Sequence, residues 1–583
     1  MITKMNDTAE HEYGQLVQFF SWLDFFLFAL MLAVSTMIGV YFGICGKKED
    51  TPKEYLHGGK TMNSIPVAFS LVTSIISGVT LLGVPSEIYR YGTTYWLMVV
   101  SVIFAGIANN YIFLPVFYEL QLTSTYEYFQ LRFNHRVRVM ASVLFTISLL
   151  LYIPIVVYVP ALVLSQVSGI NLHVITISTS ILCIFYTMMG GLKAVVWTDF
   201  LQGIIMLVST LAVITIGISY AGGFGNVWHI NEMGGRIRLF EMDPSPFRRV
   251  TFWTVVLGLT FNWIYDLSVN QTMVQKSMSL PSLTQARRAL AFQVLGLIVL
   301  ETVTCTIGLL IYSKYHDCDP LTSKVLSRPD QLATYYVAEV ASSVPGLPGL
   351  FVAGIFSAAL STMSSSLNSL GATMFEDFVR PFMKKSISDA TTNKIIKFII
   401  VTIGGVCLLF VFIVDKLGSI LQLTFSMMGV TAGAMLGLYT FGILYPKGNA
   451  CGALTGSISS LVIMGWIVFG AQTAIADGRM KLPLLPTSIE GCNSNRTIYQ
   501  NPEILDNSED DVFILYEISF MYYSLLGLTI TMVVGMIVSH FTESPPLNEM
   551  NHALFAPFVR NYVKKLVQEE KHTPEKQKLH VIR

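Results

Sequence analysis

Thirteen stretches of this sequence are apolar over a length that crosses the hydrocarbon core of a bilayer, which takes about 20 residues of helix. They cover residues 21–45, 64–89, 93–118, 138–168, 172–190, 195–221, 251–275, 289–313, 347–370, 395–415, 418–445, 449–470 and 514–540. Inside a bilayer the backbone must satisfy its own hydrogen bonds, so runs of this length become helices. The sequence therefore predicts an all-α polytopic membrane protein with about 13 transmembrane helices.

Composition excludes several classes of function. Of the 583 residues only 13% are charged, whereas soluble domains carry about a quarter. The net charge is zero, so no basic excess is present that would bind nucleic acid through its phosphates. No nucleotide-binding loop of the Walker type occurs. His135 and His173 have no cysteine or carboxylate at metal-ligand spacing, and we expect no enzymatic activity and no organic cofactor.

The basic residues predict an orientation in the membrane. Thirteen spans put the termini on opposite sides, and an outside N-terminus places 24 of the 37 lysines and arginines in inner segments, as the positive-inside rule requires. Lys193 and Lys276 belong to these inner connections. Residues 1–20 then form an extracellular tail and residues 541–583 a polar cytoplasmic tail, solvated or folded as a short surface helix. We expect the plasma membrane as its location.

Two further features concern the segments that are expected outside the cell. Sequons at Asn6 and Asn495 fall in predicted outer segments, the second in the loop 471–513, so glycosylation is expected there, although sequons also arise by chance. Of seven cysteines, only Cys318 and Cys492 lie in long outer loops. An oxidising exterior would let these two pair, provided that their Cα atoms approach within about 7 Å.

Two apolar runs contain residues that allow a helix to unwind. The first has small hydroxyl residues and a glycine between Ser70 and Thr80, followed by Pro85, and the second carries polar groups between Gly258 and Asp266. Unwound backbone is tolerated in a membrane where it lines a protein cavity. Close helix packing through small residues is the alternative explanation.

The run 347–370 has a high density of hydroxyl groups from Ala358 to Ser369. A sodium ion needs several oxygen ligands, and neutral hydroxyls with backbone carbonyls can supply them without trapping the ion. Ser361, Thr362 and the Ala358 carbonyl offer three oxygens on one side. Serine and threonine in membrane helices also bond back to their own helix, so this alternative stays open.

The segment Gly190–Gln202, GGLKAVVWTDFLQ, closely resembles the signature of the sodium/solute symporter family. The resemblance extends from about residue 20 to 470, and Leu82–Gly92, Phe113–Tyr118 and Thr125–Phe133 resemble its monocarboxylate and multivitamin branch. It implies a leucine-transporter-like core of two inverted five-helix repeats, residues 64–221 and 251–445. One N-terminal helix, 21–45, and two accessory helices within 449–540 complete the expected fold.

The same resemblance implies a sodium site. Its ligands would be the backbone oxygens of Thr73 and Ile76, the Ala358 carbonyl and the hydroxyls of Ser361 and Thr362, with Asp199 as a further sodium-linked carboxylate. Alternatively, Asp199 is an interfacial aspartate paired with Lys193 or a loop arginine.

The solute site is expected at the first broken helix. Sugar-carrying members resemble a pattern of Asn, Glu and Gln where this chain has Ile75, Val79 and Thr80, and a sugar needs many fixed hydrogen bonds. A small carboxylate needs fewer, because exposed amides and the positive end of a half-helix attract an anion. Ser77, Gly78 and Thr80 are therefore expected near the solute.

The predicted function is sodium-coupled import of a short monocarboxylate or a vitamin-like acid such as pantothenate or biotin. Asp266, after Tyr265, complicates this prediction because an ionised carboxylate in the cavity would repel an anion. With Tyr265 and Trp263 it would instead suit choline or another cation. A channel or solute receptor without coupling is the other alternative. Glu301 lies within an apolar run and receives no role; the oligomeric state is left open.

Overall fold

The computed structural model describes residues 20–45, 51–122, 124–340, 344–383, 388–414, 420–480, 483–492, 512–543, 546 and 550–565, and within them all regular structure is helical. The long helices are α2 (Trp22–Val40), α6 (Met98–Ala108), α9 (His135–Ser168), α10 (Leu172–Tyr220), α14 (Leu283–Tyr315), α16 (Leu347–Thr373), α17 (Asp389–Val414), α18 (Ile420–Leu444), α19 (Ala450–Ala476) and α20 (Tyr523–Phe541). The shorter ones are α3 (Pro52–His57), α4 (Ser64–Thr73), α5 (Gly78–Tyr91), α7 (Leu114–Leu120), α8 (Glu127–Arg132), α11 (Phe224–Met233), α12 (Leu259–Ile264), α13 (Gln271–Met278) and α15 (Leu332–Val340).

The described residues contain ten helices that are long and apolar enough to cross a membrane, or eleven if α4 and α5, which meet at 53°, form one span. Thirteen were predicted, and the difference arises at two places. The expected spans 172–190 and 195–221 form the single element α10, whose halves meet at Gly191 with a φ of 52° and a ψ of −150°. The expected span 251–275 is divided among short elements, of which the apolar part is Thr254–Val269.

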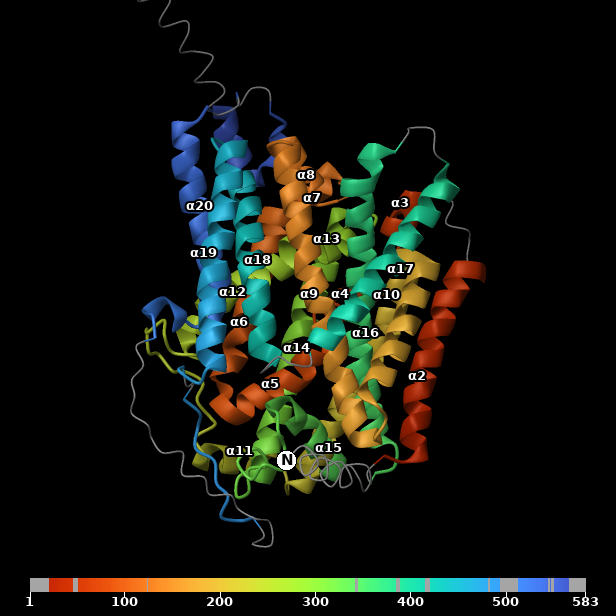
Figure 1. The fold of residues 1–583 in the computed structure, drawn as a ribbon, viewed down its shortest axis with the longest axis vertical. Coiled ribbons are helices and arrows are strands. Elements are labelled where there is room, and N and C mark those ends of the chain that lie inside the picture. Colours follow the sequence, from red (N-terminus) through yellow and green to blue (C-terminus); the bar gives the residue numbers. More distant parts are fainter. Residues whose placement is uncertain are drawn as a thin grey trace, which may run out of the picture.

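The helices differ in how much of their surface is buried. Every residue of α16 except Leu350 is buried, whereas in α2 the buried residues are Asp24, Met31, Ser35 and Gly39. Figure 1 shows α2 at one edge of the bundle and α19 and α20 at the opposite edge, with α9, α10 and α16 between them. The hydroxyl-rich helix therefore occupies the protein interior, where its polar groups do not meet lipid.

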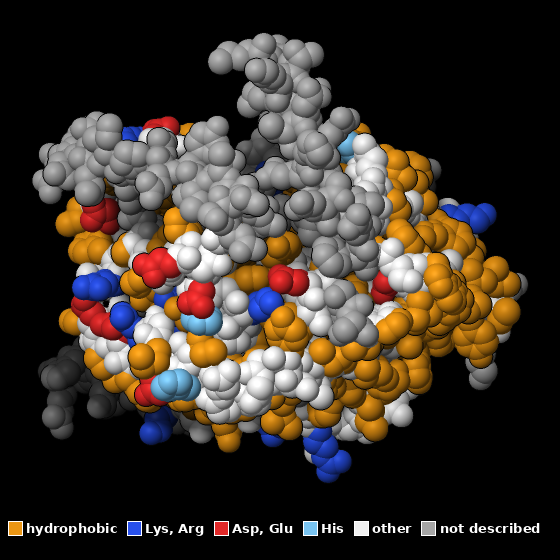
Figure 2. Space-filling model, turned by 90° about the horizontal axis from the view of Figure 1, so that it is seen from below, with side chains coloured by type: hydrophobic (Ala, Val, Ile, Leu, Met, Phe, Trp, Pro, Cys, Tyr) orange, Lys and Arg blue, Asp and Glu red, His pale blue; other side chains and the backbone are white. Residues whose placement is uncertain are grey.

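The two ends of the bundle carry different short helices. In Figure 1, α11 and α15 lie at the lower end, and α3, α7 and α8 lie toward the upper end. Seen from below, charged side chains are spread over the left and middle of the lower face, and hydrophobic ones dominate its right-hand rim (Figure 2). A hydrophobic rim around a polar end face is the surface expected of a protein whose sides contact lipid.

Part of the C-terminal segment is folded against the α7 and α8 end. The Tyr128 hydroxyl donates to the Leu554 carbonyl at 3.1 Å, and Leu554, Phe555 and Val563 are buried. Of the two alternatives considered for the tail, residues 550–565 therefore fit a short surface helix better than a solvated segment, because residues 557–565 are helical. Burial of the apolar side chains in this segment is favourable, because it removes apolar surface from water.

At the opposite end a disulfide joins Cys318 to Cys492, whose Cα atoms are 5.0 Å apart. Backbone hydrogen bonds join the same two loops, from the Asp319 amide to the Ser488 carbonyl at 2.9 Å and from the Gly491 amide to the Asp317 carbonyl at 3.0 Å. The predicted glycosylation sites Asn6 and Asn495 lie outside the described residues.

Candidate functional site

The interruption between α4 and α5 covers residues 74–77. These residues follow the end of α4 at Thr73 and precede the start of α5 at Gly78. Among the backbone hydrogen bonds formed outside helices in the described chain, none ends on the carbonyl of Thr73 or Ile76, so both oxygens are available for other partners. Pro85, expected to help break this run, lies inside the continuous helix α5. The interruption instead lies at Ser74–Ser77, where the backbone does not continue the helical hydrogen bonds of α4.

Gly78 lets α5 begin in close contact with its neighbours. A Cβ atom at this position would lie 2.9 Å from Cγ of Pro160 in α9 and 3.4 Å from Cγ2 of Ile355 in α16. The contact with Pro160 is too short for a side chain, and glycine is therefore required sterically rather than for its backbone angles. The unwound stretch is thus held directly against α9 and α16.

The hydroxyl groups of α16 face this break. The Ser361 hydroxyl donates to the Thr73 Oγ1 at 3.0 Å, whereas the Thr362 hydroxyl donates to the Ala358 carbonyl of its own helix at 3.0 Å. Thr362 therefore bonds back to its own helix, as the alternative explanation expected, whereas Ser361 bonds across to α4. All of the predicted oxygen ligands except Asp199 come from these two segments, and they are at most 2% exposed: Thr73, Ile76, Ala358, Ser361 and Thr362.

Asp199 forms an ion pair that the sequence did not predict. Its Oδ2 lies 2.8 Å from Nζ of Lys276, and the two side chains are 0% and 1% exposed. Lys193, the partner considered from the sequence, instead lies 2.7 Å from Glu54, so that pairing is wrong. Lys276, which the orientation argument assigned to an inner connection, lies in α13 and is buried.

Three serines complete the surroundings of this ion pair. The Asp199 Oδ2 accepts hydrogen bonds from Ser70 at 2.5 Å, Ser365 at 3.1 Å and Ser74 at 3.3 Å. The Lys276 ammonium donates to Ser365 at 2.6 Å and also to Ser74. The pair therefore joins α4, α10, α13 and α16, and its charges are hydrogen-bonded as burial requires. Asp199 Oδ1, in contrast, has no hydrogen-bond partner among the described residues.

A cavity opens beside the break between α4 and α5. Three of the predicted solute residues line it, namely Ser77, Thr80 and Asp266, as does the predicted sodium ligand Thr362. Gly78 and Tyr265 are buried next to lining residues but are not themselves part of the lining. The cavity wall also includes Ser74, Tyr95, Tyr152, Asn262, Trp263, Asn270, Thr272, Glu301, Ser366 and Thr424.

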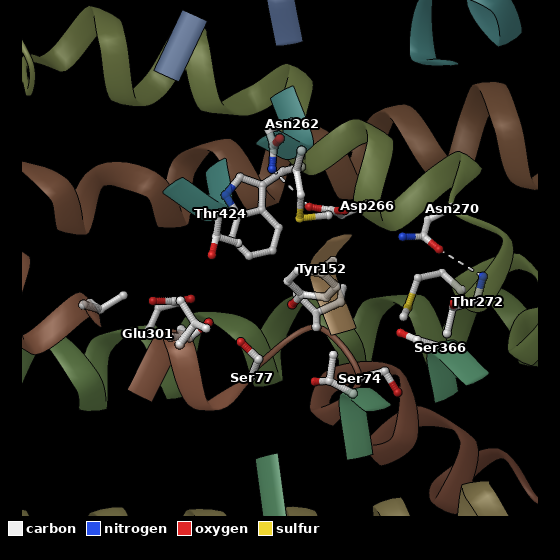
Figure 3. Close-up of a pocket in the computed structure, with 18 of the residues that line it drawn as sticks. Ser74, Ser77, Tyr152, Asn262, Asp266, Asn270, Thr272, Glu301, Ser366 and Thr424 are labelled. Atoms are coloured by element: carbon white, nitrogen blue, oxygen red, sulfur yellow. Dashed lines mark hydrogen bonds between the residues drawn. The ribbon is translucent and has the colours of Figure 1, made fainter. Parts of the chain in front are cut away.

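The cavity contains a second carboxylate that the sequence left without a role. Glu301 is 1% exposed, lines the cavity, and its Oε2 has no hydrogen-bond partner among the described residues. Asp266 is half-buried and accepts a hydrogen bond from Asn262 at 3.1 Å. Figure 3 shows Glu301 and Asp266 well apart, with Tyr152 between them in this view. A lone glutamate within an apolar run was the available signal, because such residues are costly unless they function.

A buried ion pair lies on α5 beyond the cavity. Arg249 donates to the two carboxylate oxygens of Glu87 at 2.8 and 3.0 Å and lies over the rings of Tyr91 and Phe520. Burial opposes the charge of Arg249, but the Glu87 carboxylate outweighs it and raises the pKa of Arg249 above its usual value. The positive charge of Arg249 is therefore balanced by the carboxylate of Glu87.

Comparison with known proteins identifies the family. The family model described as the sodium:solute symporter family matches residues 55–460. Human sodium-coupled monocarboxylate transporter 2 is 40% identical over 93% of this chain and 87% of its own length. Human sodium-coupled monocarboxylate transporter 1 is 39% identical over 88% and 86%. A putative sodium-dependent multivitamin transporter of Drosophila melanogaster is 37% identical over 88% and 86%.

Solved structures agree on the fold. The substrate-bound, outward-open structure of a sodium-coupled sialic acid symporter superposes with a TM-score of 0.72 at 22% identity, covering 90% of this chain and 99% of that one. A nucleobase-cation-symport-1 family transporter in a closed conformation gives a TM-score of 0.51 at 13% identity over 85% and 96%. At these identities the likeness concerns the fold alone. The match to the family model and the relatives at up to 40% identity show that this chain belongs to the sodium:solute symporter family.

Proposed function

We propose that this chain imports a small organic acid together with sodium across the plasma membrane by alternating access. The expected solutes are short monocarboxylates or vitamin-like acids such as pantothenate and biotin. The relatives named as monocarboxylate and multivitamin transporters support this choice, because they match the chain over most of its length.

One observation carries the proposal: the broken helix, the hydroxyls of α16 and the cavity meet at one place. Sodium would bind the carbonyls of Thr73, Ile76 and Ala358 and the hydroxyls of Ser361 and Thr362. Asp199 would contribute through Oδ1, since its Oδ2 balances Lys276. Neutral oxygens of this kind bind sodium reversibly, as transport requires.

The solute would lie next to this ion, at the start of α5. Thr362 belongs to both the proposed sodium site and the cavity wall. The positive end of the α5 dipole is directed at a solute carboxylate near Ser77 and Thr80. Contact between the two sites would make binding of one favour binding of the other, which is the basis of coupling.

The proposed orientation places α11, α15 and the disulfide outside the cell and residues 550–565 inside. The lysine and arginine distribution supports this orientation, as does the occurrence of disulfides in oxidising compartments.

The experiment is uptake of radiolabelled acids by cells in medium containing sodium or N-methylglucamine. The double variant Ser361→Ala/Thr362→Ala removes two proposed sodium ligands, so we expect the sodium concentration for half-maximal uptake to rise roughly tenfold or more. Ser178→Ala/Thr215→Ala is a matched control, because both hydroxyls are exposed and bond only to their own helix.

Unchanged sodium dependence in the Ser361/Thr362 variant, at equal surface amount, would refute the proposed ion site. Sodium current without solute, and without solute accumulation, would indicate an uncoupled channel or receptor instead.

A further inference from the structure

Two carboxylates line the central cavity, and no lysine, arginine or histidine is among the described residues that line it. With both carboxylates ionised, a simple monocarboxylate would enter a cavity of its own sign of charge. Like charges in a site that excludes water repel strongly. The composition of the wall thus conflicts with a solute that carries only a negative charge.

The nearest buried cations do not resolve this conflict. Lys276 is held by Asp199 at 2.8 Å and Arg249 by Glu87 at 2.8 Å. Each of these cations balances a carboxylate of its own. Neither leaves an excess positive charge for Glu301 or Asp266.

Of the two carboxylates, Glu301 is the more deeply buried. It is 1% exposed and its Oε2 has no hydrogen-bond partner among the described residues, and Figure 3 shows its side chain at one side of the cavity. A buried carboxylate is stable either as the neutral acid or as an anion that is paired and hydrogen-bonded. A cation in the adjoining cavity would supply the partner that the anion needs.

The other groups of the wall suit the same ligand. The rings of Tyr95, Tyr152 and Trp263 line the cavity, and aromatic faces attract ammonium groups. The start of α5, a helix of 14 residues, contributes Ser77 and Thr80 to the wall and favours a carboxylate. The cavity therefore offers complementary charge to both ends of a zwitterion.

We propose that the solute is a small amino acid, whose ammonium group binds beside Glu301 and whose carboxylate is directed to the start of α5. This inference rests on the proposed sodium-coupled transport and replaces its expected solutes, which are simple acids, by acids that also carry an amine. Asp266, bonded to Asn262, keeps the opposite side of the cavity favourable to the cation.

The test is sodium-dependent uptake of three classes of solute: propionate and nicotinate as simple acids, β-alanine and γ-aminobutyrate as zwitterions, and choline as a cation. We expect uptake of the zwitterions, and we expect Glu301→Gln to reduce it roughly ten- to a hundredfold, the loss typical of a charged hydrogen-bond partner. The same variant should leave uptake of simple acids equal or higher. Glu232→Gln on α11, where the side chain is exposed, is the matched control.

The outcomes separate this inference from the proposed function. Sodium-dependent uptake of simple acids alone, or of choline alone, would overturn the amino acid proposal and leave sodium coupling intact. Zwitterion uptake that is unchanged in Glu301→Gln would also overturn it. No sodium-dependent uptake of any class, by a chain present at the cell surface, would instead contradict the proposed function. Glu301→Asp, which keeps the charge, should retain more zwitterion uptake than Glu301→Gln at the same surface amount.

Discussion

Lys276 and Asp199 show how a charged pair can be retained within a membrane protein. Each is essentially inaccessible to solvent, and Asp199 Oδ2 and the Lys276 ammonium form hydrogen bonds with each other and with Ser74 and Ser365 across four helices. A pair of this kind contributes little net stability compared with apolar residues of the same volume. Removing one partner alone is costly, because the other charge then stays buried without compensation.

We expect Lys276→Met to destabilise the protein by about 3 to 5 kcal/mol, since Asp199 would lose its cation. Adding Asp199→Asn should recover part of that loss, because the uncompensated charge is removed as well. The measurement is thermal unfolding of detergent-purified protein, with surface amount in cells as a second readout. Additive losses in the double variant would contradict the interpretation.

Lys314→Met is the control for this comparison. Lys314 lies 3.2 Å from Glu339, and both side chains are partly exposed. The solvent screens such pairs, so the expected loss is at most about 1 kcal/mol.

At the scale of single elements, the break at Gly191 determines how the two halves of α10 are arranged. Its φ of +52° is a conformation that residues with a side chain rarely adopt, and a Cβ atom there would lie 2.7 Å from the carbonyl oxygen of Tyr55 in α3. Glycine is required here for both its backbone angles and its small size. The close contact with α3 also packs this short helix against the end of the bundle.

Gly191→Ala should therefore lower the unfolding temperature and the amount of protein at the cell surface, through strain of roughly 1 to 3 kcal/mol. Gly405→Ala in α17 is a suitable control, because a Cβ atom added there would have no neighbouring atom within 4 Å. Alanine in a helix is favoured over glycine by about 1 kcal/mol, so this control should be neutral or slightly stabilising. Equal effects of the two substitutions would refute the role assigned to Gly191.

Sequence patterns predicted some elements better than others. The long helices follow from runs of apolar residues, and the interruption of α4 and α5 follows from the serines near Gly78. Short helices such as α11 and α15 carry no run long enough to stand out. The pairing of Asp199 with Lys276 joins residues 77 positions apart, and only the packing of α10 and α13 against α16 reveals it. The importance of Glu301 likewise depends on the cavity beside it.

At the scale of the whole molecule, the charge of the solute affects how far it can be concentrated. One sodium ion gains about 1.4 kcal/mol from a tenfold gradient and a similar amount from a membrane potential of roughly 60 mV. A zwitterion has no net charge, so one ion would support roughly hundredfold accumulation. An anion would reach less, because the potential opposes its own entry.

The end of the molecule that carries the disulfide is joined to the first broken helix. The Tyr89 hydroxyl of α5 donates to Asp319 at 2.7 Å, next to Cys318, and the Leu485 amide donates to the Arg90 carbonyl at 3.0 Å. Movement of α5 during transport would therefore act on these crosslinked loops. Finding on which side of the membrane the disulfide lies would therefore establish the orientation of the core as well as that of the loops.

Treating intact cells with a membrane-impermeant reductant should free both thiols of the Cys318–Cys492 disulfide, and an impermeant maleimide should then label them. This result is expected because the orientation proposed above places the disulfide outside, where both reagents reach it. The variant Cys318→Ser/Cys492→Ser should remain unlabelled in intact cells, which controls for the five other cysteines. Labelling of the disulfide cysteines only after the cells are permeabilised would place this end in the cytoplasm. That result would reverse the proposed orientation of the chain, and with it the side of the membrane on which the cavity first opens to take up the solute.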